Sequence, residues 1–509
     1  MNVIQRLQST QTDENATMRT GSNKFVFVAF AFLIFQMNLE GAAGQTSADD
    51  EWQEIARERL SAIYEEGNFR AEPDRREWLT DSSAFVVRER DPQTGRQGFA
   101  QYDVQTGERT NGRRPAESDS LISPDGSHRL VRRGLAVFAI NVANEQRTKL
   151  VESDPERDIY FGKLRWSPSG NFVSFLEYDR TDVPFRTMLV PEDPSYPGTT
   201  ERRFARVGET IETLRVGIVD ASGESIHWVP LEAPEEGRYI RTIQWVPGED
   251  RLLIETLSRF RDKREFWLTS PDGNLKRLFS EINDAWAVGS HEINSGAEWL
   301  QDGSAFVFIS EKDGWRRAYK LSIEDGEVTP LMSGEYELID RAFMDEESGG
   351  YYFYASPDNG TQRYLYRVPL DGSAELERIS PGDQPGTHNY NVSPDRKWAI
   401  HSYSTANDPP QVDLVELPSH RRVRILEDNA DLRELASRVN RHAIEFVKVD
   451  IGDDVVMDAS LTRPGDFDES KKYPVFVYVY GEPYAQTVLD EWGTRHADSI
   501  DWLPILDTS

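Results

Sequence analysis

Residues 166–176 read WSPSGNFVSFL, a tight turn followed by a short alternating strand, and related phrases recur through most of the chain. Proline at the first corner of a turn and Asp-Gly after it set the sharp reversal that neighbouring strands require. Related turns stand at residues 123–126 (SPDG), 246–248 (VPG), 300–303 (LQDG) and 393–396 (SPDR). Several copies carry a tryptophan just upstream, namely Trp166, Trp245 and Trp299. The repetition predicts an array of similar β-units.

A second hairpin signal follows these units, and the pair indicates the architecture. It stands at residues 102–107 (YDVQTG), 219–223 (VDASG), 321–326 (LSIEDG) and 368–372 (VPLDG). Two hairpins give four strands, and a spacing of about 40 to 55 residues is typical of a propeller blade. We expect a mainly β fold, a β-propeller of seven or eight four-stranded blades, with eight favoured. The alternative is a β-sandwich array, but sandwiches do not usually repeat one turn phrase with an aromatic residue at a fixed offset.

The propeller pattern is interrupted once and then replaced. Prolines and charges between residues 184 and 203 predict a long excursion from one blade. After residue 430 we expect a helix over residues 431–442, strands at 446–451 and 455–461, and a strand buried on both faces at 474–480 (PVFVYVY). These elements are typical of the start of an α/β domain. We divide the chain into a signal peptide with an N-terminal extension (1–44), a helical segment (45–66), the propeller (67–430) and an incomplete α/β domain (431–509).

Composition excludes several functions. The 509 residues include 11% aromatic residues, enough for a large core, and carry a formal charge of −30, which would repel a phosphate backbone and argues against nucleic-acid binding. The absence of cysteine excludes a disulfide, a Cys-ligated zinc and a thiol nucleophile. The eight histidines are scattered singly, without the spacing of a helical zinc site. We expect no metal and no cofactor.

The N-terminus resembles a secretory signal. Residues 25–35 (FVFVAFAFLIF) form an apolar run after Arg19 and Lys24, and small residues at 41–44 offer a cleavage site. Such a run is too short to cross about 30 Å of hydrocarbon comfortably as a helix. We expect a secreted or periplasmic protein without stable membrane insertion. A membrane-anchored form with an uncleaved signal is the alternative.

Several phrases, taken in order, match a known family. Residues 166–170 (WSPSG), 215–220 (RVGIVD), 310–315 (SEKDGW), 426–429 (LEDN) and 468–474 (DESKKYP) resemble the dipeptidyl peptidase IV branch of the prolyl oligopeptidase family of serine peptidases. The resemblance implies an eight-bladed propeller beside an α/β-hydrolase domain, here the truncated beginning of one. It also implies removal of dipeptides from peptide N-termini by acyl transfer through a Ser-Asp-His triad. Residues 206–209 (RVGE) match the family's blade-crossing segment, with Ile211 and Glu212 in place of its usual Asn-Pro.

The resemblance assigns two site residues. Tyr480 matches the tyrosine that donates its hydroxyl to the oxyanion, a contribution worth about 2.7 to 4 kcal/mol for one such donor; the alternative is a core tyrosine. The family also holds the substrate ammonium with a Glu-Glu pair ahead of the WSP phrase. The matching stretch, residues 154–158 (DPERD), has no such pair and leaves Glu156 as the candidate. A solvated acidic turn is the alternative for Glu156.

The nucleophile motif is absent from the printed sequence. No G-x-S-x-G occurs in it, so the triad would lie beyond residue 509 and we expect this polypeptide to be inactive. The first hypothesis is therefore the propeller portion of a secreted serine-type dipeptidyl peptidase, with peptides that have a free N-terminus as substrates and a homodimer for the full-length parent. The alternative is a non-catalytic secreted propeller that binds peptides or protein partners. The strand predicted at 474–480 favours a peptidase origin.

Overall fold

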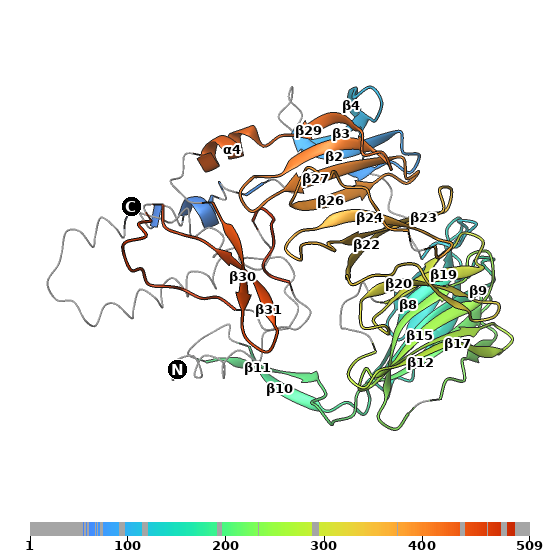
Figure 1. Ribbon diagram of the computed structural model, residues 1–509. Helices are drawn as coiled ribbons and strands as arrows, with labels where there is room; N and C mark the ends of the chain where they lie inside the picture. Colours follow the sequence, from blue (N-terminus) through green and yellow to red (C-terminus); the bar gives the residue numbers. More distant parts are fainter. Residues whose placement is uncertain are drawn as a thin grey trace. The chain divides into compact units, whose positions relative to one another are not determined.

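The computed structural model describes residues 75–493, apart from 91–96, 114–120, 191–195, 233, 288–294, 374, 438–442, 466 and 480–485, together with residues 54, 57–58, 61–66, 68 and 70–71 (Figure 1). The chain forms two compact units. The larger unit consists of Pro73–Asp428 and Val488–Trp492, and the smaller of Met1–Glu72, Asn429–Thr487 and Gly493–Ser509. The predicted signal peptide of residues 1–44 lies outside the described residues. No helix in the described part of the chain is long and apolar enough to span a bilayer.

Besides one two-stranded hairpin, the larger unit holds seven antiparallel sheets among its described residues, six of four strands and one of three. The first four sheets are β1 (Glu77–Trp78), β2 (Ala84–Arg90), β3 (Gln97–Asp103) and β4 (Arg109–Asn111); β5 (His128–Arg133), β6 (Ala136–Asn141) and β7 (Arg147–Glu152); β8 (Ile159–Trp166), β9 (Phe172–Asp179), β12 (Thr213–Asp220) and β13 (Ile226–Trp228); and β14 (Arg238–Trp245), β15 (Leu252–Ser258), β16 (Lys263–Thr269) and β17 (Leu275–Ile282). The last three are β18 (Glu298–Trp299), β19 (Ala305–Ser310), β20 (Arg317–Ser322) and β21 (Val328–Pro330); β22 (Leu338–Asp345), β23 (Gly350–Ala355), β24 (Tyr364–Pro369) and β25 (Glu377–Arg378); and β26 (Thr387–Val392), β27 (Trp398–Ser404), β28 (Gln411–Glu416) and β29 (Arg422–Glu427). These are the blades of the predicted propeller.

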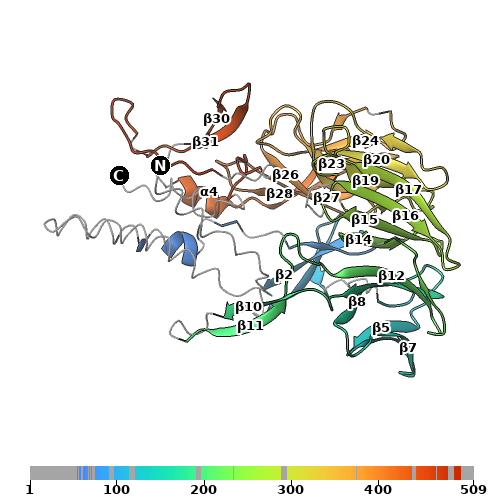
Figure 2. The same cartoon turned by 90° about the horizontal axis from the view of Figure 1, so that it is seen from below.

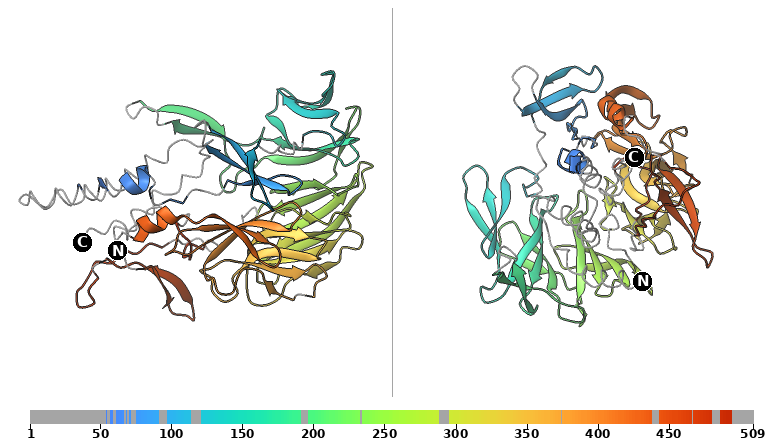
Figure 3. Two further views of the ribbon diagram at one scale, coloured as in Figure 1. Left: turned by 90° about the horizontal axis from the view of Figure 1, so that it is seen from above. Right: turned by 90° about the vertical axis from the view of Figure 1, so that its left-hand side faces the viewer.

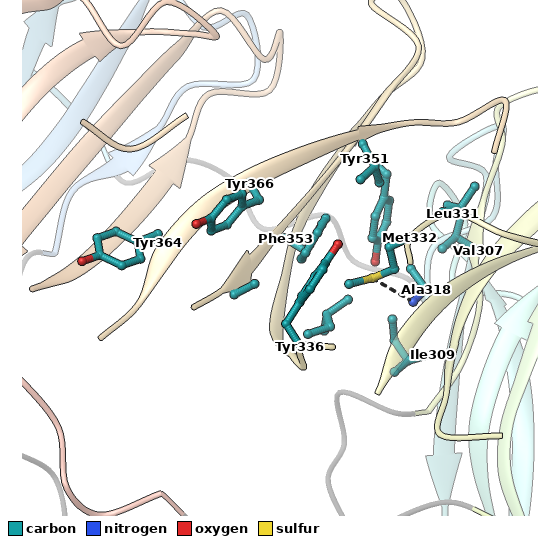
Figure 4. Packing of buried hydrophobic residues seen from close by; sticks show 13 residues of the cluster. Val307, Ile309, Ala318, Leu331, Met332, Tyr336, Tyr351, Phe353, Tyr364 and Tyr366 are labelled. Atoms are coloured by element: carbon teal, nitrogen blue, oxygen red, sulfur yellow. Dashed lines mark hydrogen bonds between the residues drawn. The ribbon is translucent and has the colours of Figure 1, made fainter. Parts of the chain in front are cut away.

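Neighbouring sheets pack face to face. The second strands of two successive sheets, β19 and β23, are buried on both faces along their whole length. Figure 4 shows one such layer, in which Val307 and Ile309 pack with Phe353 of the next sheet and the Ala318 N–H donates to the sulfur of Met332 at 3.4 Å. Corresponding clusters join each sheet from β5–β7 onward to the one after it.

The last sheet packs on the first. Phe85 of β2 forms one apolar cluster with Ile400 of β27 and Val412 of β28. The Ser82 hydroxyl accepts from the Asp395 N–H at 2.9 Å, so the turns of the two sheets also meet. The array thereby returns to its beginning, and the right-hand view of Figure 3 shows the sheets of this unit standing around a common centre. This arrangement confirms the predicted β-propeller.

The recurring turn phrase has one structural role. In the first SPDG copy, the Ser123 hydroxyl donates to Asp125 Oδ1 at 2.6 Å, that oxygen accepts the Ser127 N–H at 3.0 Å, and Gly126 adopts φ 73°. These bonds hold the pKa of Asp125 at about 2, chiefly through the Ser123 hydroxyl. The turn closes directly before β5. The other copies stand just before β9, β15, β19 and β27, so each turn lies at the reversal ahead of a strand.

The tryptophan upstream of the turn links consecutive sheets. The first strands of four sheets end on tryptophan, and three of these indoles bond to the sheet before. Trp166 Nε1 donates to the Leu121 carbonyl at 3.1 Å, and Trp245 Nε1 to the Arg165 carbonyl at 3.3 Å. Trp78 Nε1 donates to Asn391 of the last sheet at 3.0 Å, so the same bond joins the two ends of the array.

The predicted excursion is a two-stranded hairpin. Strands β10 (Phe185–Val190) and β11 (Gly198–Arg203) lie between β9 and β12 in the sequence. Among the described residues they pair only with each other. Figure 2 shows this hairpin projecting from its sheet. Three of its apolar side chains, Phe185, Met188 and Leu189, are exposed.

The smaller unit confirms some predicted elements and corrects another. It contains the π-helix η2 (Ser61–Glu65), α4 (Ala430–Ser437), β30 (Glu445–Asp450) and β31 (Val456–Leu461). The helix and the two strands lie where the sequence predicts them, whereas the buried strand at 474–480 is a wrong prediction for its described residues. Residues 474–479 form no strand, and Val475 is 81% and Val477 72% exposed. Burial on both faces needs flanking strands, and no described strand pairs with this segment.

Candidate functional site

The two residues assigned by resemblance have different outcomes. Tyr480 lies outside the described residues. Glu156 lies in the turn before β8, where its N–H donates to Asp154 Oδ1 at 2.9 Å and its side chain is exposed. Among the described residues no group of three His, Asp or Glu side chains is arranged to hold a metal ion. The surroundings of Glu156 therefore decide what this part of the propeller can bind.

Asp158, two residues further on, is neutralised by two arginines. Arg180 Nη2 donates to Asp158 Oδ1 at 2.9 Å, and Arg203 Nε donates to Oδ2 at 2.7 Å. Burial pushes the pKa of Asp158 upward, but the two guanidinium groups outweigh it and hold the pKa below its usual range. Each oxygen of this carboxylate is therefore already bonded to an arginine. It fixes the base of the β10–β11 hairpin rather than offering a charge to a ligand.

Arg203 also bonds to the backbone between β9 and β10. Its Nη1 donates to the carbonyls of Thr181 and Val183 at 2.7 Å each, and its guanidinium lies 4.2 Å from the centre of the Phe185 ring. The Thr181 hydroxyl in turn accepts the Asp158 N–H at 3.1 Å. These contacts connect the turn before β8, the end of β9 and the last residue of β11. The local backbone around Glu156 and Asp158 is thereby held in one arrangement.

Two tyrosines stack beside this network. Tyr160 of β8 and Tyr178 of β9 are cross-strand partners, and their rings are parallel within 4° with centres 4.5 Å apart. The Arg180 guanidinium lies 5.1 Å from the centre of the Tyr160 ring. Both rings are half-buried. Aromatic ring faces of this kind attract cations through cation–π interactions.

Glu212 is the carboxylate that the network leaves uncompensated. It immediately precedes β12, whose first residue, Thr213, pairs with Asp179 of β9. Burial raises the pKa of Glu212, and the charge of Arg180 only partly opposes this. Burial also raises the pKa of Tyr160 and Tyr178, and the Glu212 charge adds to both shifts. The Glu212 carboxylate therefore lies near the stacked rings.

This cluster can bind a cation. Within the described part of the chain, neither Glu156 nor Glu212 has a hydrogen-bonding or ion-pairing partner for its side chain. A half-buried carboxylate gains most from a partner that donates several hydrogen bonds and carries a positive charge, and an ammonium group does both. Burial raises the pKa of Glu212, and a bound ammonium group would oppose that shift.

Sequence reasoning singled out the acidic stretch at residues 154–158, which forms a turn before β8, and missed the rest of this cluster. Asp158 belonged to the stretch compared with the family's Glu-Glu pair, but its two arginine partners come from the end of β9 and from β11. Glu212 showed a signal, since a charged residue replaces the proline usual in the family. Its proximity to Tyr160 and Tyr178 depends on strand register, which the sequence did not show.

Comparisons with known proteins agree with this fold. A family model described as the dipeptidyl peptidase IV (DPP IV) N-terminal region matches residues 81–410. A probable dipeptidyl-aminopeptidase B of Emericella nidulans is 26% identical over 359 residues, 65% of this chain and 39% of that protein. The dipeptidyl peptidase 4 of Trichophyton rubrum is 22% identical over 380 residues, 69% of this chain and 48% of that protein.

A solved structure agrees as well. The crystal structure of Porphyromonas gingivalis dipeptidyl peptidase 4 superposes with a TM-score of 0.68 at 21% identity, covering 85% of this chain and 62% of that one. At this identity the likeness concerns the fold alone. The chain spans between 39% and 50% of the length of the curated relatives it matches.

Proposed function

This chain belongs to the family of dipeptidyl peptidase IV N-terminal regions, and from that premise we propose that its propeller binds peptides by their free N-terminus for a serine-type dipeptidyl peptidase. The peptidase part of the proposal is supported by the two fungal relatives above, which are a probable dipeptidyl-aminopeptidase B and a dipeptidyl peptidase 4. On this proposal the reaction is acyl transfer by a Ser-Asp-His triad. The propeller contributes recognition and orientation of the substrate.

One observation carries the proposal: Glu212 is a half-buried carboxylate with a raised pKa and no paired cation in the described part of the chain. An ammonium group would supply the missing charge and up to three hydrogen bonds. The parallel rings of Tyr160 and Tyr178 would flank it. Glu156, exposed on the adjacent turn, would add a second negative charge from the solvent side.

The polypeptide itself is proposed to bind without cleaving. Its printed sequence has no G-x-S-x-G, and the described residues offer no nucleophile assigned to the reaction. Secretion belongs to the same proposal, supported by the apolar run at residues 25–35. So does a homodimer of the full-length parent. The second candidate, a non-catalytic propeller that binds protein partners, is supported by the exposed apolar side chains of the β10–β11 hairpin.

Calorimetric titration tests the proposal. The full chain is titrated with an Xaa-Pro tripeptide and with the same peptide acetylated at its N-terminus. We expect binding of the free peptide only, and binding about tenfold weaker for Glu212→Gln, because a hydrogen bond to a charged group contributes about 1.5 to 3 kcal/mol. Glu224→Gln, in the β12–β13 turn at the other end of the same sheet, is the matched control.

Each of three results would contradict part of the proposal. Equal affinity for the free and acetylated peptides would remove the ammonium site. Turnover of a chromogenic Xaa-Pro dipeptide substrate above a blank would show that the polypeptide is active as it stands, contrary to the non-cleaving part of the proposal. Binding of neither peptide would favour the protein-binding alternative.

A further inference from the structure

A short segment from the C-terminal part of the chain docks on the propeller. Residues 488–492 belong to the larger unit although the rest of the sequence around them does not. Asp490 is 8% exposed and is the centre of the contact. Its N–H donates to the Thr361 carbonyl at 2.7 Å, and its Oδ1 and Oδ2 accept from the Ala406 N–H and from Gln362 Nε2 at 2.9 and 3.0 Å.

The docking reaches two neighbouring residues of β26 and β27. The Asp490 carbonyl accepts from the Thr387 hydroxyl at 2.9 Å, and the Trp492 N–H donates to the Ser404 hydroxyl at 3.3 Å. Thr387 and Ser404 are themselves cross-strand partners. The segment is therefore held by the first rung of the β26–β27 ladder. Any distortion of that rung acts on both bonds.

The next rung carries a buried imidazole. His388 of β26 pairs with Tyr403 of β27, and their ring centres are 4.8 Å apart. His388 Nδ1 lies 2.9 Å from His401 Nε2, and the His401 ring lies 4.6 Å from that of His420. His388 is 0% and His401 1% exposed. Three of the histidines that the sequence shows as scattered singletons thus gather at one place, because strand pairing joins positions 13 residues apart.

The hydrogen bonds fix the protonation of this pair. His388 Nε2 lies 2.9 Å from the Gln384 carbonyl, which can only accept, so Nε2 carries the proton. In a neutral ring Nδ1 is then the acceptor, and His401 Nε2 donates to it. His401 Nδ1 is left as a buried lone pair with no partner among the described residues. The pair has room for two protons and no position for a third.

A third proton disrupts the pair at either site. On His388 it would set two N–H groups against each other across 2.9 Å. On His401 it would create a buried cationic N–H without an acceptor. We propose that this imidazole pair is an acid-sensitive latch: neutral, it holds the β26–β27 rungs that dock residues 488–492, and protonated, it releases that segment. The proposal rests on these contacts and not on the peptide-binding function.

The surrounding groups favour the neutral pair. His420 of the β28–β29 turn and Arg378 of β25 both lower the pKa of His388, in addition to its burial, and so favour its neutral form. The tyrosines of the neighbouring strands remain neutral, because burial raises the pKa of each of them: Tyr354, Tyr390 and Tyr403. Tyr364 of β24 stacks obliquely on His388 at 5.4 Å.

One carboxylate faces the pair from β28. Asp413 is the cross-strand partner of His401. It accepts two bonds from Gln411 Nε2 at 3.1 and 2.9 Å and lies 3.9 Å from Arg422. Burial raises its pKa. The charges of Asp490 and Asp408 add to the rise in the pKa of Tyr403, which burial causes first.

The direction of the pH dependence follows from the histidines. Burial lowers the pKa of His388 to about 4 and holds that of His401 well below its usual value. A histidine with a folded-state pKa below its unfolded value of about 6.5 contributes stability that is complete above 6.5 and is lost as the pH falls through the interval down to 4. Release is therefore expected between pH 6.5 and 4.

Hydrogen exchange of the full chain tests the latch. Protection factors, corrected for the pH dependence of intrinsic exchange, are measured for peptides that contain Asp490 and Trp492 and for peptides from β14–β17. We expect protection of residues 488–492 to be constant from pH 8 to 7 and lost between 6.5 and 4, while β14–β17 stays protected. Protection of the segment that persists at pH 4, or that is lost together with β14–β17, would overturn the proposal.

A variant and a second measurement keep the test independent of folding defects. His401→Gln retains an N–H donor at the place of Nε2 without titrating, so we expect the pH of release to fall by about one unit, whereas His227→Gln in β13 leaves it unchanged. Exchange at the imidazole C2 position, read by mass spectrometry on the unmodified chain, gives the titration of each histidine. His388 or His401 titrating near 6.5 would contradict the latch.

Discussion

Trp78, Trp166 and Trp245 each bind the sheet before them, whereas Trp299 at the corresponding place does not. The Trp299 indole nitrogen is buried without a partner among the described residues, although its ring packs on Phe306 with centres 5.0 Å apart. The sequence showed the repeated tryptophan but not this difference, because the carbonyl acceptor comes from a neighbouring blade. The two kinds of tryptophan should respond differently to substitution.

The first prediction compares Trp166→Phe with Trp299→Phe. Trp166→Phe removes a hydrogen bond worth about 0.5 to 1.5 kcal/mol net and leaves a carbonyl unpaired. Trp299→Phe removes an unpaired N–H, so we expect it to destabilise less by about that amount. The shift of the urea midpoint measures both. A larger loss for Trp299→Phe would show that the indole bond does not link the blades.

Glu212 marks the limit of prediction at the same scale. Its identity was visible in the sequence, and so was its departure from the family pattern. Its candidate role became apparent only from its burial and from the hydrogen bond that Arg180 donates to Asp158 instead. A carboxylate without a partner cannot be recognised until the partners of its neighbours are known.

At the scale of single strands, several strands of the propeller contain buried charged side chains. Arg264 of β16 and Glu255 of β15 are both 0% exposed, and Arg264 Nε donates to Glu255 Oε1 at 2.8 Å. The second carboxylate oxygen accepts the Gly296 N–H at 2.7 Å, from the next sheet. This pair fastens two blades through their interior.

The second prediction concerns this buried pair. Arg264→Met leaves Glu255 with less compensation in the interior and should cost about 3 to 5 kcal/mol in urea unfolding. Adding Glu255→Gln, which keeps an acceptor for Gly296, should recover part of the loss. Arg421→Met, at an exposed pair with Glu416, is the control and should change the urea midpoint little, because water screens exposed ion pairs. Equal losses for the buried and exposed pairs would contradict the assignment.

The elements after residue 430 show which strands can be predicted from sequence alone. Strands β30 and β31 pair with each other, so local pattern and turn sufficed to predict them. Residues 474–479 have the same apolar character, but a strand also needs neighbours to bond with. Composition indicates the tendency to form a strand, and pairing decides whether it forms.

The molecule as a whole was predictable where its sequence repeats. Turn, strand and tryptophan recur at blade spacing, and each copy reports the same local structure. The closure of the array through Phe85 and Ile400 follows from that repetition. The cluster around Glu212 and the histidine pair do not repeat, so the periodic pattern could not predict them.

The central claim is that the propeller holds the free N-terminus of a peptide beside Glu212. Hydrogen exchange of the full chain with and without a saturating Xaa-Pro peptide tests it most directly. We predict added protection at residues 154–160 and 209–214, and none with the N-acetylated peptide. Protection confined to other blades, or equal protection with the acetylated peptide, would contradict the account.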